Sequence, residues 1–323
     1  MALTKVSNSM LVQPVNHNIL INPSFTVKQR GDVVDHGNIS YGPDRWKVRG
    51  KDTVGGTELK SSTEVDSATG INKLVVKHPR DATDPIKGSA YTFQRVEAVN
   101  LQGMYGKEMT FSFGHSDVGG SGIPKVEIRS FDSSAASKDL YYATPTSLGD
   151  NRWACTVTLS TTDGTIPDPS EHGMQVTIFP NEGNNAPDEW SVWETKLEVG
   201  SVATPFIARQ YGEELALCQR YYYEGYLAEW SPVAPWSNLY VCRVSFPVPL
   251  RGPPTYTAIS SSILYSNVSQ NVSTITNLQW REDGTGTRVF FQLGPNWTGT
   301  PPSPVSASGI LACTFMAKVD AEL

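Results

Sequence analysis

Residues 204–224, TPFIARQYGEELALCQRYYYE, hold the one helix-like pattern of this 323-residue chain. From Glu213 to about Tyr222, apolar residues such as Leu215 and Cys218 recur at helical spacing. Acidic residues stand at the start of this stretch and a basic one near its end, as the helix dipole favours. Since a helix of about 10 residues is marginal alone in water, we expect a short helix that packs on other structure and joins two regions.

Strand-like patterns stand on both sides of this helix. Apolar and polar residues alternate, and a period of two places successive side chains on opposite faces of a strand. The clearest examples are KEMTFSF (107–113), WACTVTLS (153–160), MQVTIF (174–179), LYVCRVSFPVPL (239–250) and ILACTFMAKV (310–319). Because Pro247 and Pro249 cannot donate ladder hydrogen bonds, the run 239–250 is predicted to be an edge strand.

Length and composition favour two β-domains. Hydrophobic residues make up 39% of the chain and charged residues only 18%, while 27 Gly and 22 Pro supply frequent turns. A chain of this length exceeds one ordinary core. The sequence therefore predicts an all-β protein, with one β-sandwich joined by the short α-helix to a second.

Charge and targeting signals exclude several classes of partner. The net charge of −6 argues against a broad surface for nucleic acid or anionic membrane, so neither nucleic-acid binding nor membrane insertion is predicted. No run approaches the ~20 apolar residues that span a bilayer, and the start MALTKVSNSM lacks the apolar region of a signal peptide. The four cysteines are far apart, which indicates buried free thiols; they are Cys155, Cys218, Cys242 and Cys313.

Catalytic constellations are missing from the sequence. It contains no H-E-x-x-H, no G-x-S-x-G and no P-loop, and its five histidines are scattered. Acid pairs such as Asp163 with Asp168 fall in turn-like loops, where acids are common. We therefore predict no enzyme, no cofactor and no metal. A glycoside hydrolase, or calcium held by loops such as NEGNNAPDE (181–189), is the less favoured alternative.

Tryptophans suggest where a sugar could bind, because the apolar face of a sugar ring packs on a flat side chain. One group falls in strand patterns and is predicted to be core: Trp46, Trp153 and Trp193. The other group falls in Pro/Gly-rich segments and is predicted to contact carbohydrate: Trp230, Trp236 and Trp297. Burial between subunits is the alternative for this second group.

Three segments resemble a known family. NILINPSFTVKQRG (18–31) with YGPDRWKV (41–48) resembles the opening of the jelly-roll module common in phage tail-fibre and virion proteins. WSVWETKLEVGSVATPFIARQYGEELALCQRYY (190–222) is similar to the closing part of that module, although Ile207 stands where an acidic residue is usual. MALTKVSNSM (1–10) looks like the N-terminal peptide of phage tailspikes and fibres.

The resemblance implies a homotrimeric virion protein with a carbohydrate-binding-module-like jelly roll. The implied domains are an attachment peptide (1–18), the jelly-roll domain (19–208), a linker helix (209–224) and a C-terminal β-sandwich tip (225–323). Virion anchoring is assigned to Leu3, Val6 and Met10. A subunit interface is assigned to Leu215, Tyr221 and Tyr222; packing between helix and strand is the alternative for the tyrosines.

These expectations together predict a non-enzymatic phage tail fibre. It would be made in the host cytoplasm, reside in the virion, attach to other tail proteins by its N-terminus, and recognise host-surface polysaccharide. Several identical sites on one particle would convert weak sugar binding into firm attachment. A purely structural capsid-decoration or tail-assembly protein is the alternative, and a depolymerase is a third possibility.

Overall fold

The computed structural model describes the chain in segments, which are residues 18–31, 34–35, 39–49, 59–77, 90–118, 123–131, 137–158, 172–180, 189–226, 233–236, 239–243, 246–252, 255–265, 268–271, 275–282, 287–293 and 310–322. The chain divides into two compact units. The N-terminal unit comprises Met1–Leu215 with Leu323, and the C-terminal unit comprises Ala216–Glu322. The division falls inside the helix and not at either end of it.

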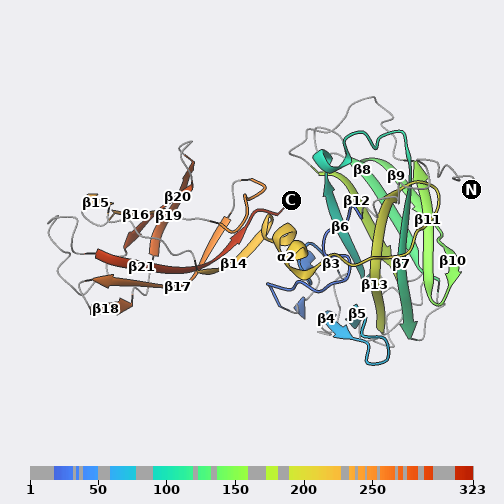
Figure 1. Ribbon diagram of the computed structural model, residues 1–323, viewed down its shortest axis with the longest axis horizontal. Coiled ribbons are helices and arrows are strands. Elements are labelled where there is room, and N and C mark those ends of the chain that lie inside the picture. The colour runs from blue at the N-terminus through green and yellow to red at the C-terminus, as the bar shows by residue number, and fades with distance from the viewer. Residues whose placement is uncertain are drawn as a thin grey trace, which may run out of the picture. The chain divides into compact units, whose positions relative to one another are not determined.

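The N-terminal unit is a sandwich of two antiparallel sheets (Figure 1). Sheet A joins, in order, β1 (Val34–Asp35), β4 (Leu59–Val65), β5 (Asn72–Lys77), β13 (Glu189–Val199), β7 (Glu108–Val118), β11 (Arg152–Thr158) and β10 (Thr146–Gly149). Sheet B joins β2 (Ile39–Tyr41), β3 (Lys47–Arg49), β6 (Tyr91–Glu97), β12 (His172–Phe179), β8 (Lys125–Phe131) and β9 (Ser137–Ala143). A 3-10 helix, η1 (Ala98–Leu101), connects β6 to β7.

The core of this unit lies between the two sheets. The alternation read from the sequence is confirmed, since Met109, Phe111 and Phe113 of β7 are fully buried in one cluster with Val176 and Ile178 of β12. Consecutive strands often belong to different sheets, as when β6, β7 and β8 pass from B to A and back to B. Each sheet therefore gathers strands that are far apart in the sequence, and each has an outward face built from distant segments.

The tryptophans predicted to be core occupy two different faces. Trp46 is fully buried in the core, and Trp153 packs against it. Trp193 is also buried, but it pairs with Gly114 on the face of sheet A that points away from the core. A Cβ on Gly114 would lie 2.1 Å from the Trp193 ring, so only glycine leaves room for that ring to lie on the sheet.

The helix is shorter and begins earlier than the sequence predicts. The structure has α2 at Tyr211–Gln219, followed by β14 (Tyr222–Tyr226). Glu213 and Glu214 fall in its first turn, as expected. The tyrosines that follow belong to a turn and a strand instead, because the backbone from Tyr222 pairs with β21.

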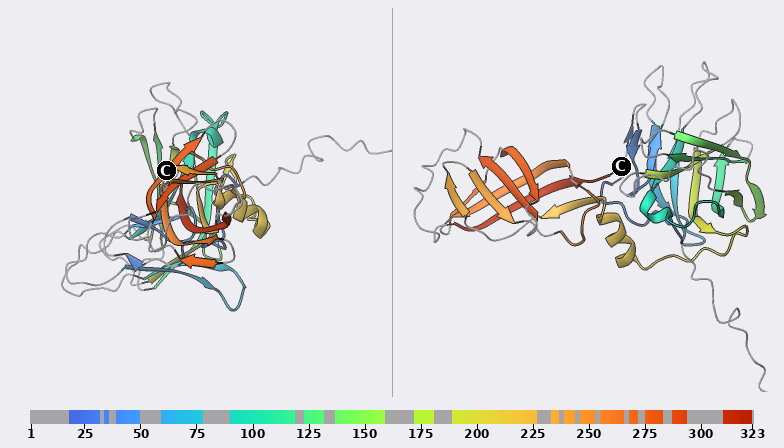
Figure 2. Two further views of the ribbon diagram at one scale, coloured as in Figure 1. Left: turned by 90° about the vertical axis from the view of Figure 1, so that its left-hand side faces the viewer. Right: turned by 90° about the horizontal axis from the view of Figure 1, so that it is seen from above.

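The C-terminal unit contains two further four-stranded antiparallel sheets, seen from two more directions in Figure 2. Sheet C has the order β14, β21 (Ile310–Asp320), β17 (Thr255–Tyr265), β18 (Val268–Asn271). Sheet D has the order β15 (Val233–Trp236), β16 (Leu239–Arg243), β20 (Thr287–Leu293), β19 (Ile275–Glu282). The protein is thus all-β, with one sandwich joined by a short helix to another.

The long strand predicted over residues 239–250 is wrong in its extent and its position. β16 ends at Arg243, and residues 246–250 are not in a strand. β16 also lies between β15 and β20, so it is not an edge. Pro247 and Pro249 explain why no strand continues through residues 246–250, because neither can donate a ladder hydrogen bond. No helix among the described residues is long and apolar enough to cross a bilayer.

Candidate functional site

Two buried polar clusters fall on the residues that resemble phage virion proteins. The first fixes the irregular segment 200–210, called the strap, to the outward face of sheet A, and Figure 1 shows the strap passing in front of β7 and β13. Lys196 is fully buried there. Its Nζ lies 3.1 Å from Glu198 Oε2 and donates to the carbonyl of Pro205 at 3.1 Å. Glu198 also accepts from the amide of Thr204 at 2.8 Å.

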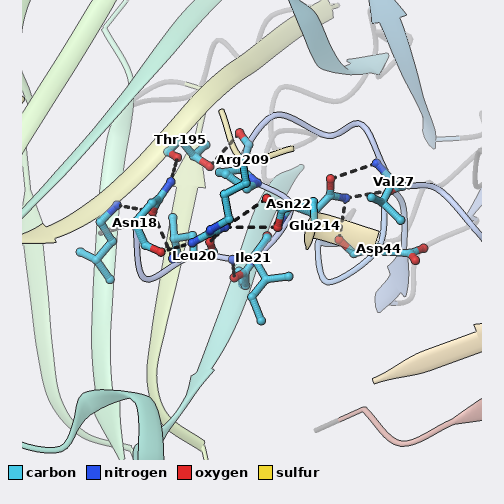
Figure 3. A network of polar contacts seen from close by, with 12 residues as sticks. Asn18, Leu20, Ile21, Asn22, Val27, Asp44, Thr195, Arg209 and Glu214 are labelled. Atoms are coloured by element: carbon cyan, nitrogen blue, oxygen red, sulfur yellow. Dashed lines mark hydrogen bonds and ion pairs between the residues drawn. The ribbon is translucent and has the colours of Figure 1, made fainter. Parts of the chain in front are cut away.

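The second cluster, shown in Figure 3, ties the end of the strap to the beginning of the sandwich. The Arg209 guanidinium lies 3.1 Å from Glu214 Oε2 and donates to the carbonyls of Leu20, at 3.0 Å, and Asn18. Glu214 is 2% exposed and accepts from the backbone amide of Asn22. We call these contacts the clamp.

The side chains of two asparagines complete the clamp by forming hydrogen bonds with backbone groups. Asn18 donates to the carbonyl of Thr195 at 2.8 Å and accepts from the amide of Leu197 at 3.1 Å. Asn22, which has a positive φ of 52°, donates to the carbonyl of Val27 at 2.7 Å. These groups satisfy buried backbone of segment 18–27, which belongs to no strand, and of β13 beside its register shift, so the clamp and the strap contacts serve stability.

The outward face of sheet B has a different character, and its strand register arranges it in rows. The first row crosses β3, β6, β12 and β8 through Arg49, Tyr91, Phe179 and Lys125. The rings of Tyr91 and Phe179 lie 4.9 Å apart, and Arg49 donates to the Tyr91 hydroxyl at 2.9 Å. An aromatic pair is therefore flanked by a basic residue on either side.

The second row forms a buried floor. It runs through Lys47, Phe93, Thr177 and Glu127. Phe93, Thr177 and Glu127 are between 0% and 4% exposed although they point away from the sandwich core. Lys47 is half-buried and lies 4.6 Å over the ring of Tyr41.

The third row consists of polar groups that orient one another. Arg95 and Arg129 stand on either side of Gln175. Arg95 Nε donates to Gln175 Oε1 at 3.2 Å, and Gln175 Nε2 donates to Thr177 Oγ1 at 3.1 Å. Burial lowers the pKa of the Arg95 guanidinium, and the positive charge of Arg129 lowers it further, while Tyr41 raises it. These side chains are held in place before any ligand arrives.

The three rows, together with Tyr41 on β2, define what we call the sheet B face. Half-buried aromatic rings, planar guanidinium groups, an amide and a hydroxyl are gathered there on regular strands. Such a set suits a ligand with both an apolar face and many hydroxyl groups, which describes a sugar. This is the best candidate for a functional site among the described residues.

Sequence-based prediction missed this face. The signal was present in KVR (47–49) and YTFQR (91–95), where every second residue is aromatic or basic. Only tryptophans were considered for sugar binding, and the Tyr and Phe residues that alternate outward on these strands were not. No pattern within one strand shows that β3, β6, β12 and β8 lie side by side.

The predicted site residues are placed only in part. Trp236 belongs to β15, but its side chain lies outside what the structure describes, as do Trp230 and Trp297. The anchoring residues Leu3, Val6 and Met10 also fall outside the described residues. The carbohydrate and anchoring roles of these residues stay predictions.

The residues predicted for a subunit interface are described. Leu215 is half-buried, and Tyr221 and Tyr222 are only 1% and 3% exposed. The Tyr222 hydroxyl donates to Glu224 at 2.7 Å. Since one chain already covers both tyrosines, little of their surface is left to meet a partner. Their role between subunits stays a prediction.

Buried titratable groups in the core do not form a catalytic set. His115 is 1% exposed, and burial lowers its pKa to about 4. Its ring centroid lies 6.2 Å from that of Trp190. Burial raises the pKa of Cys155 to about 12, so its thiol stays protonated. Cys155 and Cys218 are free and buried, as predicted. Within the described segments, no three His, Cys, Asp or Glu residues gather where a metal could bind.

Comparisons with known proteins find similarity in structure only. No protein-family model matches the chain, and no curated protein matches its sequence. A domain of the bacteriophage CBA120 tailspike protein 4, described as enzymatically active, is similar at 12% identity and a TM-score of 0.34. That match covers 56% of this chain and 21% of the tailspike domain, so this chain spans about a fifth of that domain.

Two smaller proteins are matched over nearly their whole length. The C-terminal family 22 carbohydrate-binding module of Clostridium thermocellum Xyn10B is 14% identical with a TM-score of 0.31, and the match covers 58% of this chain and 99% of the module. A cyclase from Fischerella sp. is 15% identical with a TM-score of 0.35, and the match covers 58% of this chain and 98% of the cyclase.

The prediction that the chain is not an enzyme is corrected by these matches. The similar structures include a tailspike domain described as enzymatically active and a cyclase. At such low identities and TM-scores the likeness assigns no activity.

Proposed function

We propose that this protein is a phage tail fibre or related virion appendage that recognises host-surface glycans, and that it does so through the sheet B face. The observation that carries the proposal is the half-buried pair Tyr91 and Phe179 beside the buried polar side chains of Thr177 and Gln175, which are hydrogen-bonded to one another. Aromatic rings beside oriented hydrogen-bonding groups are the means by which proteins hold sugars.

The virion location is supported by the sequence. Segments 18–31 and 190–222 resemble the ends of a jelly-roll module of phage virion proteins, and segment 1–10 resembles their attachment peptide. The clamp gives the first two segments a shared physical task, since it bonds Asn18 and Asn22 to Arg209 and Glu214. A trimer would present three sheet B faces, and such multivalency strengthens weak binding.

A glycan array probed with the full chain tests the proposal. Tyr91→Ala and Phe179→Ala should each weaken binding by about tenfold or more, because each removes half of the aromatic pair. Tyr211→Ala is the matched control, since Tyr211 is a 59% exposed tyrosine on α2. Equal binding by all three variants would place the glycan site elsewhere, and no binding by the unaltered chain would refute glycan recognition.

The virion assignment needs a separate test. Antibody against the purified protein should label intact particles at the tail, and particles lacking the protein should adsorb poorly to host cells. Normal adsorption without it would favour a purely structural role. Its mass in solution should correspond to three chains, and a monomeric mass would contradict the trimer.

A further inference from the structure

We propose that the glycan bound by the sheet B face is acidic and carries carboxylate groups, an inference that rests on the proposed function. Among described residues, the three rows contain more basic than acidic side chains. The basic ones are Lys47, Arg49, Arg95, Lys125 and Arg129; the acidic one is Glu127, which is paired with Arg129. The whole chain carries a net charge of −6, so this positive face runs against the overall charge of the protein.

Charge and aromatic surface are combined within one row. Arg49 on β3 and Lys125 on β8 stand at the two ends of the row that holds Tyr91 and Phe179. Strands β3 and β8 are three spacings apart, and at about 4.8 Å per spacing this separates the two basic residues by about 14 Å. A ligand that touches both therefore extends over more than one sugar ring, with negative groups on either side of the stacked ring.

The type of cation favours a carboxylate. Arg49, Arg95 and Arg129 present planar guanidinium groups, whose paired N–H donors match the two oxygens of a carboxylate. One such contact already exists on the face, where Arg129 pairs with the carboxylate of Glu127. The geometry of this surface is thus compatible with carboxylate binding.

A nucleic acid is the main competing anionic ligand, because it also combines phosphate charge with flat bases. The buried residues of the second and third rows disfavour a nucleic acid. Glu127 places a buried carboxylate in the middle row, and Gln175 and Thr177 supply amide and hydroxyl groups suited to sugar hydroxyls. The Tyr91 ring is tilted by 46° against Phe179 and by 44° against Phe93, so the rings do not form a continuous platform for stacked bases.

Binding of the full chain to polysaccharides with and without their carboxylates tests the proposal. The probes are hyaluronan and polygalacturonate, each compared with its carboxyl-reduced form at low and at high salt. The unaltered chain should bind at least one acidic form about tenfold more tightly than its reduced form, and salt should diminish the difference. The double variant Arg49→Gln with Lys125→Gln should lose most of this preference.

The control variant removes the same charge elsewhere. Lys60 and Lys107 are exposed and lie outside the sheet B face, so the double variant Lys60→Gln with Lys107→Gln should keep the preference. Equal affinity for acidic and reduced forms would overturn the acidic ligand while leaving glycan binding intact. No binding to any of the four polymers would overturn both proposals. Tighter binding to single-stranded DNA, lost in the same Arg49 and Lys125 variant, would identify the face as a nucleic-acid site instead.

Discussion

The two outward faces of the N-terminal sandwich use charged residues in opposite ways. On sheet A, Lys77 lies 3.3 Å from Glu64 and 3.5 Å from Glu189, and Lys196 lies 3.1 Å from Glu198 beneath the strap. On sheet B, basic residues exceed acidic ones and stand beside half-buried aromatic rings. The charged residues named on sheet A pair with one another, whereas on sheet B one such pair, Arg129 with Glu127, is accompanied by further basic residues. The difference supports the proposal that sheet B, and not sheet A, carries the binding site.

The clamp should give the largest effect of any substitution on the cohesive side. Glu214→Ala leaves Arg209, whose side chain is 18% exposed, without its carboxylate, and breaking a largely buried pair in this way costs about 3–5 kcal/mol. The free energy of unfolding, measured by urea titration, should fall by that amount. Glu213→Ala is the matched control, because Glu213 is its exposed neighbour on the same helix. Similar losses in both variants would show that the clamp contributes no more than a surface charge.

Acidification should affect the core through His115. Because its pKa in the folded protein is about 4, below the ordinary 6.5, the unfolded chain takes up the proton first as the pH falls. This contribution to stability is complete above pH 6.5 and is lost between pH 6.5 and about 4. The shift corresponds to about 3 kcal/mol. His115→Leu should abolish that part of the pH dependence, as judged by urea titrations at pH 7.5 and 4.5. An unchanged difference between the two pH values would assign the loss to carboxylates alone.

Substitution of Gly114 tests whether the Trp193 ring needs a glycine beneath it to cover the outward face of sheet A. In Gly114→Ala the new methyl group meets the Trp193 ring, so the ring must move, and overpacking of this kind costs about 1–3 kcal/mol. Tryptophan fluorescence and the melting temperature should both change. Gly212→Ala is the control, since a Cβ at Gly212 meets nothing within 4 Å. Unchanged fluorescence in Gly114→Ala would mean that the position of the Trp193 ring does not require a glycine at residue 114.

The smallest effect is expected at the exposed ion pairs of sheet A. The side chain of Lys77 is 46% exposed, and its partners are similarly open to solvent. Lys77→Ala should therefore lower the free energy of unfolding by only about 0–1 kcal/mol, and less in high salt. A loss as large as that of Glu214→Ala would erase the distinction between buried and exposed charge on this side of the sandwich.

Local patterns in the sequence were sufficient for several of the strands and much of the core. Period-two alternation identified Met109, Phe111 and Phe113 correctly, since it depends only on neighbours along one strand. The end of the helix was misplaced because Tyr222 pairs with a strand nearly a hundred residues away, at Asp320, and this pairing overrides the helical spacing. Tertiary pairing of this kind leaves no local trace.

The candidate site was beyond prediction for the same reason. Arg49, Tyr91, Phe179 and Lys125 come from four separate segments, and only the order of strands in sheet B makes them one row. The clamp is similar, since Asn18 and Arg209 are distant in the sequence and adjacent in the fold. The motifs around both residues were recognised as a family resemblance, but their physical task became evident only from the contacts.

The clamp also determines how the N-terminal unit would respond to pulling. The clamp bonds the first described residues of this unit, near Asn18, directly to the end of its last segment, near Glu214, through Arg209 and Asn22. Tension applied at both ends would therefore load these few bonds before it reached the strands of either sheet. A protein that tethers a particle to a moving cell would gain mechanical resistance from such a closure, with the sheet B face left undistorted.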